Sequence, residues 1–147
     1  MNYHIKNSTL LLIILALIIS CNQNQNQEDI TINEETDSLA AIIANLDEQI
    51  MITHDEVMPK IGLVLSLRRN INAKIDSCRT KSCKEELQKI SYALTKADAD
   101  MMQWMRSYQT PQGKDTAITY LQNQQTEIDR VKLQILQSIE AAKKVTQ

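Results

Sequence analysis

The sequence predicts an all-α fold, an antiparallel up-down bundle of three long helices with coiled-coil-like packing. The chain has 147 residues with only two glycines, two prolines and no phenylalanine, a composition that disfavours β-rich and loop-rich folds. Apolar residues recur at steps of three and four over long stretches, which is the spacing of one helix face. Two short polar segments, 78–83 and 109–114, separate these stretches. Short connections between long helices make consecutive helices antiparallel.

Residues 1–20 have the organisation of a secretory signal peptide. Lys6 supplies the positive charge, and an uninterrupted apolar run over 10–19 follows it. This run is shorter than the roughly 20 apolar residues that a membrane-spanning helix needs. It ends in Ile18-Ile19-Ser20-Cys21, which resembles the lipobox of bacterial lipoproteins. An ordinary signal peptide followed by an unmodified cysteine is the alternative.

The lipobox resemblance implies that the Cys21 thiol takes a diacylglycerol and that the leader is then removed. The new amino terminus would be acylated, for example with palmitate. Each buried CH2 of such chains adds about 0.8 kcal/mol to membrane attachment, so several chains make a durable anchor. We therefore expect the protein in the bacterial cell envelope. Asn22 is not the aspartate that retains lipoproteins in the inner membrane of enteric bacteria, which favours the outer membrane, facing the periplasm.

Residues 21–36 are polar and low in complexity, so we expect a flexible tether between the lipid anchor and the helices. The full chain has 16 basic and 18 acidic residues. Loss of Lys6 with the leader leaves 15 against 18, a net charge of −3. This balance offers no electrostatic basis for binding nucleic acid.

The first helix is expected to begin near Thr36, where Thr36, Asp37 and Ser38 are suited to N-capping. Pro59 lies within this helix, and proline removes a backbone donor and crowds the preceding turn. We therefore expect a kink near 56–60, or a break at Pro59 that would give four helices. The apolar stripe of this helix consists of Leu39, Ile43, Leu46, Ile50, Val57, Ile61, Val64, Leu67, Ile71 and Ile75.

Cys78 and Cys83 flank the first turn. Because cysteines of exported proteins normally oxidise, we predict a disulfide that staples the helix hairpin. Closing so small a loop should add about 2–3 kcal/mol in the chain-entropy model. A redox pair and a thiolate metal site are the alternatives. The spacing differs from the C-x-x-C of redox folds, and no histidine lies nearby in the sequence.

The second and third helices complete the predicted bundle domain, 37–147. The inward stripe of the second helix consists of Leu87, Ile90, Leu94, Ala97, Met101, Trp104 and Tyr108. The third helix is expected over 115–144, and its stripe consists of Ile118, Leu121, Ile128, Val131, Ile135 and Ile139.

The methionines other than Met1 fall in two short segments, one around His54 and one around Trp104. Met51, His54 and Met58 are spaced i, i+3 and i+7, so they share one helix face. If the first helix continues through Pro59, antiparallel pairing about the first turn brings the two segments together. The predicted cluster consists of His54, Met58, Met102 and Met105, with Trp104, Met51 and Met101 nearby.

Three interpretations of this cluster remain open. Methionine is a flexible filler of irregular cores, and the segment around Pro59 leaves irregular space to fill. An exposed methionine-rich patch would suit a protein partner. Thioether and imidazole ligands together select a soft cation such as Cu(I) or Ag(I), and a tryptophan face adds a cation–π contact.

The segments His54-Asp-Glu-Val-Met-Pro-Lys-Ile-Gly62 and Met101-Met-Gln-Trp-Met105 resemble the small helical lipoproteins of Bacteroidota that are often labelled viral A-type inclusion protein. The resemblance covers about residues 40–108. It implies a helical exported protein and assigns no catalytic residue.

The sequence favours a binding or structural role over an enzymatic one. Asp55 and Glu56 adjoin His54, but adjacent helix positions point in different directions. Catalytic triads, metalloprotease motifs and phosphate-binding glycine loops are absent from the sequence. We expect a membrane-anchored helical module of the cell envelope with no cofactor. The alternatives are a soft-metal-binding protein, using Cu(I) or Ag(I), and a self-associating helical envelope protein.

Overall fold

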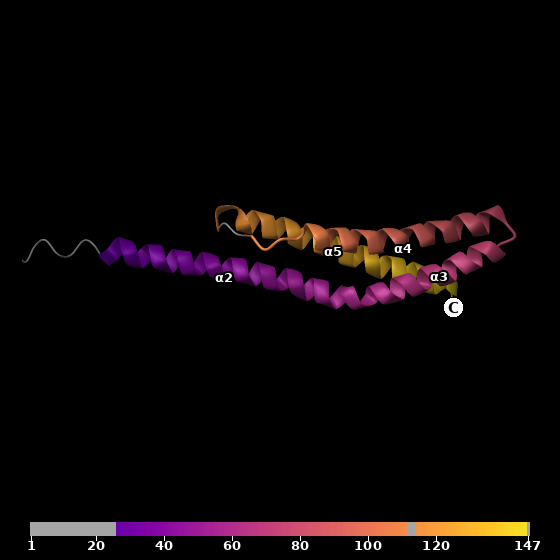
Figure 1. Ribbon diagram of the computed structural model, residues 1–147, viewed down its shortest axis with the longest axis horizontal. Coiled ribbons are helices and arrows are strands. Elements are labelled where there is room, and N and C mark those ends of the chain that lie inside the picture. Colours follow the sequence, from indigo (N-terminus) through magenta and orange to yellow (C-terminus); the bar gives the residue numbers. More distant parts are fainter. Residues whose placement is uncertain (1–25, 112–113, 147) are drawn as a thin grey trace, which may run out of the picture. The chain divides into compact units, whose positions relative to one another are not determined.

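The computed structural model describes the backbone over 26–111 and 114–146 and the side chains over 36–111 and 116–146. These residues form helices joined by short turns, and no strand occurs among them. The elements are α2 (Asn26–Val57), a 3₁₀ turn η1 (Met58–Lys60), α3 (Ile61–Ser77), α4 (Lys81–Ser107) and α5 (Lys114–Thr146), shown in Figure 1. The predicted leader and Cys21 lie outside the described residues. No helix in the described part of the chain is both long and apolar enough to span a membrane.

The first helix begins at Asn26, not near Thr36 as predicted. Residues 26–35 contain no glycine or proline, the two residue types that most disfavour a helix interior. The expected tether over 21–36 therefore overlaps a segment, 26–36, whose backbone is helical. The chain divides into two units, 1–40 and 41–147, and the core and all the sites below belong to the second.

At Pro59 the chain bends without folding back. Val57, Lys60 and Ile61 all keep right-handed helical dihedral angles through the 3₁₀ turn. The inward stripe also continues across it, because Val57, Ile61 and Val64 are all buried. Together α2 and α3 therefore act as one kinked helix, as expected from a proline that lacks a donor. The bundle has three helical arms.

In the second unit α3, α4 and α5 each pack against the other two, which confirms the all-α bundle. The predicted stripes supply most of the core. Ile118 is only partly buried, and the neighbouring Ala117 takes its place inside. The buried apolar core consists of Ile50, Val57, Ile61, Val64, Leu67, Ile71, Leu87, Leu94, Ala97, Met101, Trp104, Leu121, Ile128, Val131, Ile135, Ile139 and Ala142.

The predicted disulfide between Cys78 and Cys83 is present, with the two Cα atoms 5.9 Å apart. It closes the turn between α3 and α4. Thr80 caps α4, because its Oγ1 accepts a hydrogen bond from the backbone N–H of Cys83 at 3.2 Å. The staple and the cap together fix where the hairpin reverses direction.

Candidate functional site

An aromatic ladder joins α2, α4 and α5 in the half of the bundle away from the disulfide. The rings of His54 and Trp104 stack with centroids 5.7 Å apart. Trp104 meets Tyr108 at 5.0 Å, and Tyr108 meets Tyr120 at 6.3 Å. Such ring pairs stabilise packing beyond the area they bury. The ladder therefore fixes how the histidine of α2 is placed against α4.

Tyr108 also ties α4 to α2 through its hydroxyl, which donates a hydrogen bond to Asp47 Oδ1. Burial raises the pKa of Tyr108 strongly, and the Asp47 carboxylate adds to the rise. Nothing in the sequence pattern singled out Asp47 or Tyr120, because neither belongs to a motif. Only their positions opposite Tyr108 give them a role.

His54 is held in a defined orientation. Its side chain is 15% exposed, and its Nδ1 lies 2.8 Å from Asp55 Oδ1. A carboxylate accepts hydrogen bonds, so the contact favours the tautomer with a proton on Nδ1. The lone pair of the neutral imidazole then lies on Nε2, which can act as a ligand or an acceptor.

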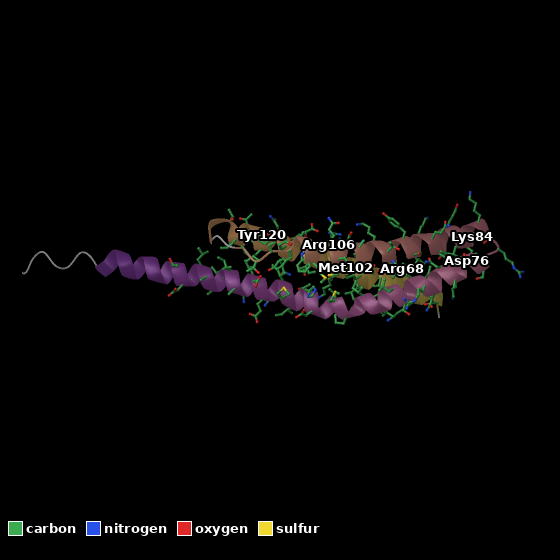
Figure 2. The ribbon with its side chains drawn as sticks, viewed as in Figure 1. Arg68, Asp76, Lys84, Met102, Arg106 and Tyr120 are labelled. Atoms are coloured by element: carbon green, nitrogen blue, oxygen red, sulfur yellow. A yellow bond between two sulfur atoms is a disulfide. The ribbon has the colours of Figure 1, made fainter. Side chains whose placement is uncertain are left out.

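One flank of α4 faces α3 and α2. Arg68 of α3 approaches Asp98 of α4 with Nη1 to Oδ2 at 3.8 Å, and Ser91 donates to Asn72 at 2.7 Å. Positions 98, 102 and 105 follow each other at steps of four and three, so they share this flank. Met102 extends from it in Figure 2.

The structure separates the predicted methionines into three groups. Met101 is fully buried and belongs to the core. Met58 and Met102 are partly buried and pack against that core. Met51 and Met105 are 37% and 41% exposed.

The register of the predicted pairing shifts by about one helical turn. Equal spacing about a turn midpoint near residue 80 or 81 puts position 54 opposite about position 107, whereas the ring of His54 stacks on Trp104. Side chains on a helix lean toward its N-terminus, and the bend at Pro59 alters the path of α2, so counting residues from the turn is inexact.

A network of ion pairs links α4 to α5. Asp100 accepts from Lys96 at 2.7 Å and from Arg130 at 3.1 Å, and Arg130 also pairs with Glu127 at 3.0 Å. Burial acts to raise the pKa of Asp100, but the hydrogen bonds from Lys96 and Arg130 outweigh it, so the pKa is lowered. The hydrogen bond that Arg130 donates to Asp100, and after it the one that Arg130 donates to Glu127, raise the pKa of Arg130.

A small polar pocket of about 150 Å³ adjoins this network. The indole Nε1 of Trp104 and the Oε1 of Gln124 are both buried without a hydrogen-bond partner among the described residues. The pocket is lined by Asp100, Gln103, Trp104, Ser107, Gln124, Glu127 and Arg130.

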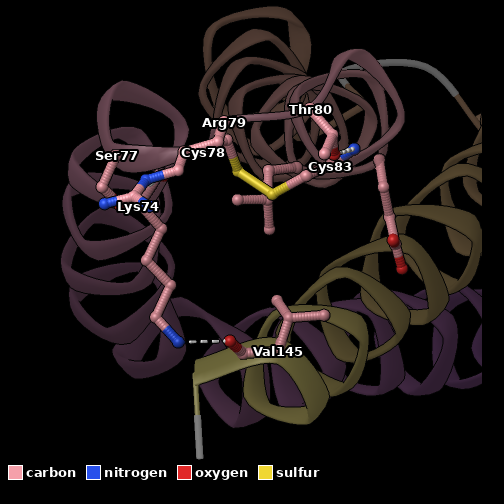
Figure 3. Close-up of a pocket in the computed structure, with 9 residues that line it drawn as sticks. Lys74, Ser77, Cys78, Arg79, Thr80, Cys83 and Val145 are labelled. Carbon is pink, nitrogen blue, oxygen red and sulfur yellow. Dashed lines mark hydrogen bonds between the residues drawn. A yellow bond between two sulfur atoms is a disulfide. The ribbon is translucent and has the colours of Figure 1, made fainter.

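A second pocket, of about 610 Å³, lies at the turn end of the bundle, where the disulfide forms part of its wall (Figure 3). Lys74 Nζ donates to the backbone oxygen of Val145 at 2.5 Å and so ties α3 to the end of α5. The lining consists of Lys74, Ser77, Cys78, Arg79, Thr80, Cys83, Glu86, Leu87 and Val145.

No protein-family model, curated protein or solved structure matches this chain. Among the described residues, no three His, Cys, Asp or Glu side chains are grouped so that they could hold a metal ion.

Proposed function

We propose that this chain is a lipid-anchored lipoprotein of the bacterial cell envelope, and that its helical bundle is a binding or structural module. The observation that carries the proposal is the segment Ile18-Ile19-Ser20-Cys21 directly after an apolar leader. The disulfide of the first turn supports export, because such bonds persist in oxidising compartments. The anchor is Cys21, and the expected location is the outer membrane, facing the periplasm.

A binding role is supported by large apolar side chains that the bundle leaves in solvent. Among them are five aliphatic side chains on the kinked helix and on α5. Exposed apolar groups gathered on a surface commonly mark contacts with other proteins. The residues are Ile42, Ile52, Leu63, Leu133 and Leu136. This surface could be covered by a protein partner or by a second copy of this chain, and the crosslinking experiment below distinguishes the two.

Metabolic labelling with an alkyne analogue of palmitate tests the anchor. The full chain is expressed in a bacterial host with two membranes, and we expect the label on the chain and the chain in the membrane fraction. Cys21→Ser should abolish both, whereas Cys78→Ala with Cys83→Ala should leave both unchanged. An unlabelled chain of leader-free mass in the soluble periplasmic fraction would contradict the anchor.

Photo-crosslinking in intact cells tests the binding surface. A photoreactive residue at position 133 is expected to give an adduct, whereas one at position 123, an exposed polar site of α5, should not. An adduct of twice the chain mass identifies self-association, and another mass identifies a partner. The absence of any adduct at position 133 would contradict the role of this surface.

A further inference from the structure

We propose that the face between α2 and α4 binds one soft monovalent cation, Cu(I) or Ag(I). The ligands are His54 Nε2 and the thioether sulfurs of Met58, Met102 and Met105, and the Trp104 ring lies alongside. The proposal concerns the folded bundle and does not depend on the lipid anchor.

The imidazole is already arranged as a metal ligand. The 2.8 Å contact between His54 Nδ1 and Asp55 Oδ1 leaves the lone pair on Nε2. Histidines that bind metals commonly donate their other ring N–H to a carboxylate, which fixes the ring and makes the ligating nitrogen more basic. Asp55, to which the sequence assigned no role, therefore supports His54 as a ligand.

The thioethers come from two flanks that the packing turns toward each other. His54 lies in the last turn of α2, and Met58 follows four residues later as the first residue of the 3₁₀ turn η1. The flanking residues Val57 and Lys60 keep right-handed helical dihedral angles, so the two side chains leave the kinked helix on about the same side. On α4, Met102 and Met105 lie on the flank that Asp98 marks by its contact with Arg68 of α3. The His54–Trp104 stack shows that α2 meets α4 at this height. On this register the proposed site takes His54 and Met58 from the kinked helix, and Met102 and Met105 from α4.

The donor set selects the kind of cation. Thioether sulfur and imidazole favour Cu(I) and Ag(I), whereas Ca²⁺ and Mg²⁺ need oxygen ligands. A cation held by His54 also lies beside the face of Trp104, where the ring quadrupole attracts positive charge. Met58 and Met102 are partly buried, so the site is shielded from water, and the 41% exposure of Met105 leaves an entry path.

Packing alone predicts a different behaviour for the same residues. If the methionines only fill space, replacing them with leucine, which has a similar volume, changes no cation response. The two interpretations are therefore separable by conservative substitution. Met101 supplies the matched control, because it is a buried methionine of the same segment that lies outside the ligand set.

The test is a titration of the purified full chain in detergent, carrying Cys21→Ser to remove the one cysteine outside the disulfide. Cu(I) is kept reduced with ascorbate, which spares disulfides, and is buffered with bicinchoninate. Ag(I) is titrated in parallel. The readout is the fluorescence of Trp104, the single tryptophan of the chain. We expect quenching that saturates at one equivalent and persists against the chelator.

The variants assign the ligands. His54→Ala, and Met58→Leu combined with Met102→Leu, should each weaken binding at least about 100-fold, whereas Met101→Leu should leave it unchanged. Asp55→Asn should weaken it about 10- to 100-fold, as expected for a partner of a ligating histidine. Circular dichroism melting of each apo variant checks that it is folded.

Three results would overturn the site. The first is that neither cation quenches the fluorescence of the parent chain. The second is that the folded His54→Ala variant binds the cation as tightly as the parent does, and the third is that the folded leucine double variant does so. Because the titration uses a chain without a lipidation site, its failure would not bear on the anchor, and failure of the palmitate experiment would not bear on the metal.

Discussion

Removal of the Cys78–Cys83 disulfide tests how the hairpin is stabilised. The bond joins two cysteines that are five positions apart in the sequence, on either side of the turn between α3 and α4. In the chain-entropy model, a closed loop of about six residues lowers the entropy of the unfolded chain by roughly 7 cal/mol/K, or about 2 kcal/mol at 25 °C. The expected loss of unfolding free energy in Cys78→Ala with Cys83→Ala is therefore about 2 kcal/mol.

Urea denaturation followed by circular dichroism measures this loss. The midpoint should fall, and the wild-type chain treated with a phosphine reductant should match the double variant, because both lack the same cross-link. Both cysteines also touch the core, so a somewhat larger loss in the alanine variant than in the reduced chain would report their packing. A reduced chain as stable as the oxidised one would refute the reasoning, since the loop would then contribute nothing.

Three further predictions concern the core, the ion-pair network and the aromatic ladder. Leu94 is fully buried, so Leu94→Ala should lower the unfolding free energy by about 2–5 kcal/mol in the same urea assay. Leu133 is 56% exposed, so Leu133→Ala should change it by no more than about 0.5 kcal/mol. Equal effects of the two substitutions would contradict the observed packing. Asp100 has a lowered pKa in the folded chain, so its stabilising contribution is present above the ordinary aspartate pKa of about 3.9 and is lost as pH falls through the lower folded-state value. Asp100→Asn should therefore reduce the acid sensitivity of the melting temperature, and an unchanged profile would refute this. Tyr108→Phe removes the hydroxyl that donates to Asp47 and should cost about 1 kcal/mol at neutral pH. Because the folded-state pKa of Tyr108 is raised, the wild-type advantage should shrink as pH rises above about 10, and a constant difference in high-pH melting would count against it.

Local rules predicted the features that depend on neighbours in the chain. The kink follows from Pro59 alone, because a missing donor and a ring clash act on the residue's own turn. The disulfide follows from two cysteines on either side of a short turn, whose ends must be close in a hairpin. The start of α2 at Asn26 was missed because an N-cap motif near Thr36 permits a helix start without requiring one.

Relations between helices were predicted only approximately. Antiparallel counting brought the segment around His54 to the segment around Trp104, and the rings do stack. It could not separate the buried Met101 from its partly exposed neighbours, because the position of a helix face depends on the twist and bend of both helices. The hydrogen bond from Tyr108 to Asp47 joins residues 61 apart and has no local signature.

By itself the sequence determined an all-helical chain with a kinked first arm and a stapled turn, because helical periodicity, proline and cysteine spacing act over a few residues. The tertiary structure decided which side chains meet: His54 with Trp104, Arg68 with Asp98, and Asp100 with Arg130. Those contacts depend on how far each helix is rotated and shifted against the next, and only the packing of the whole core sets that rotation.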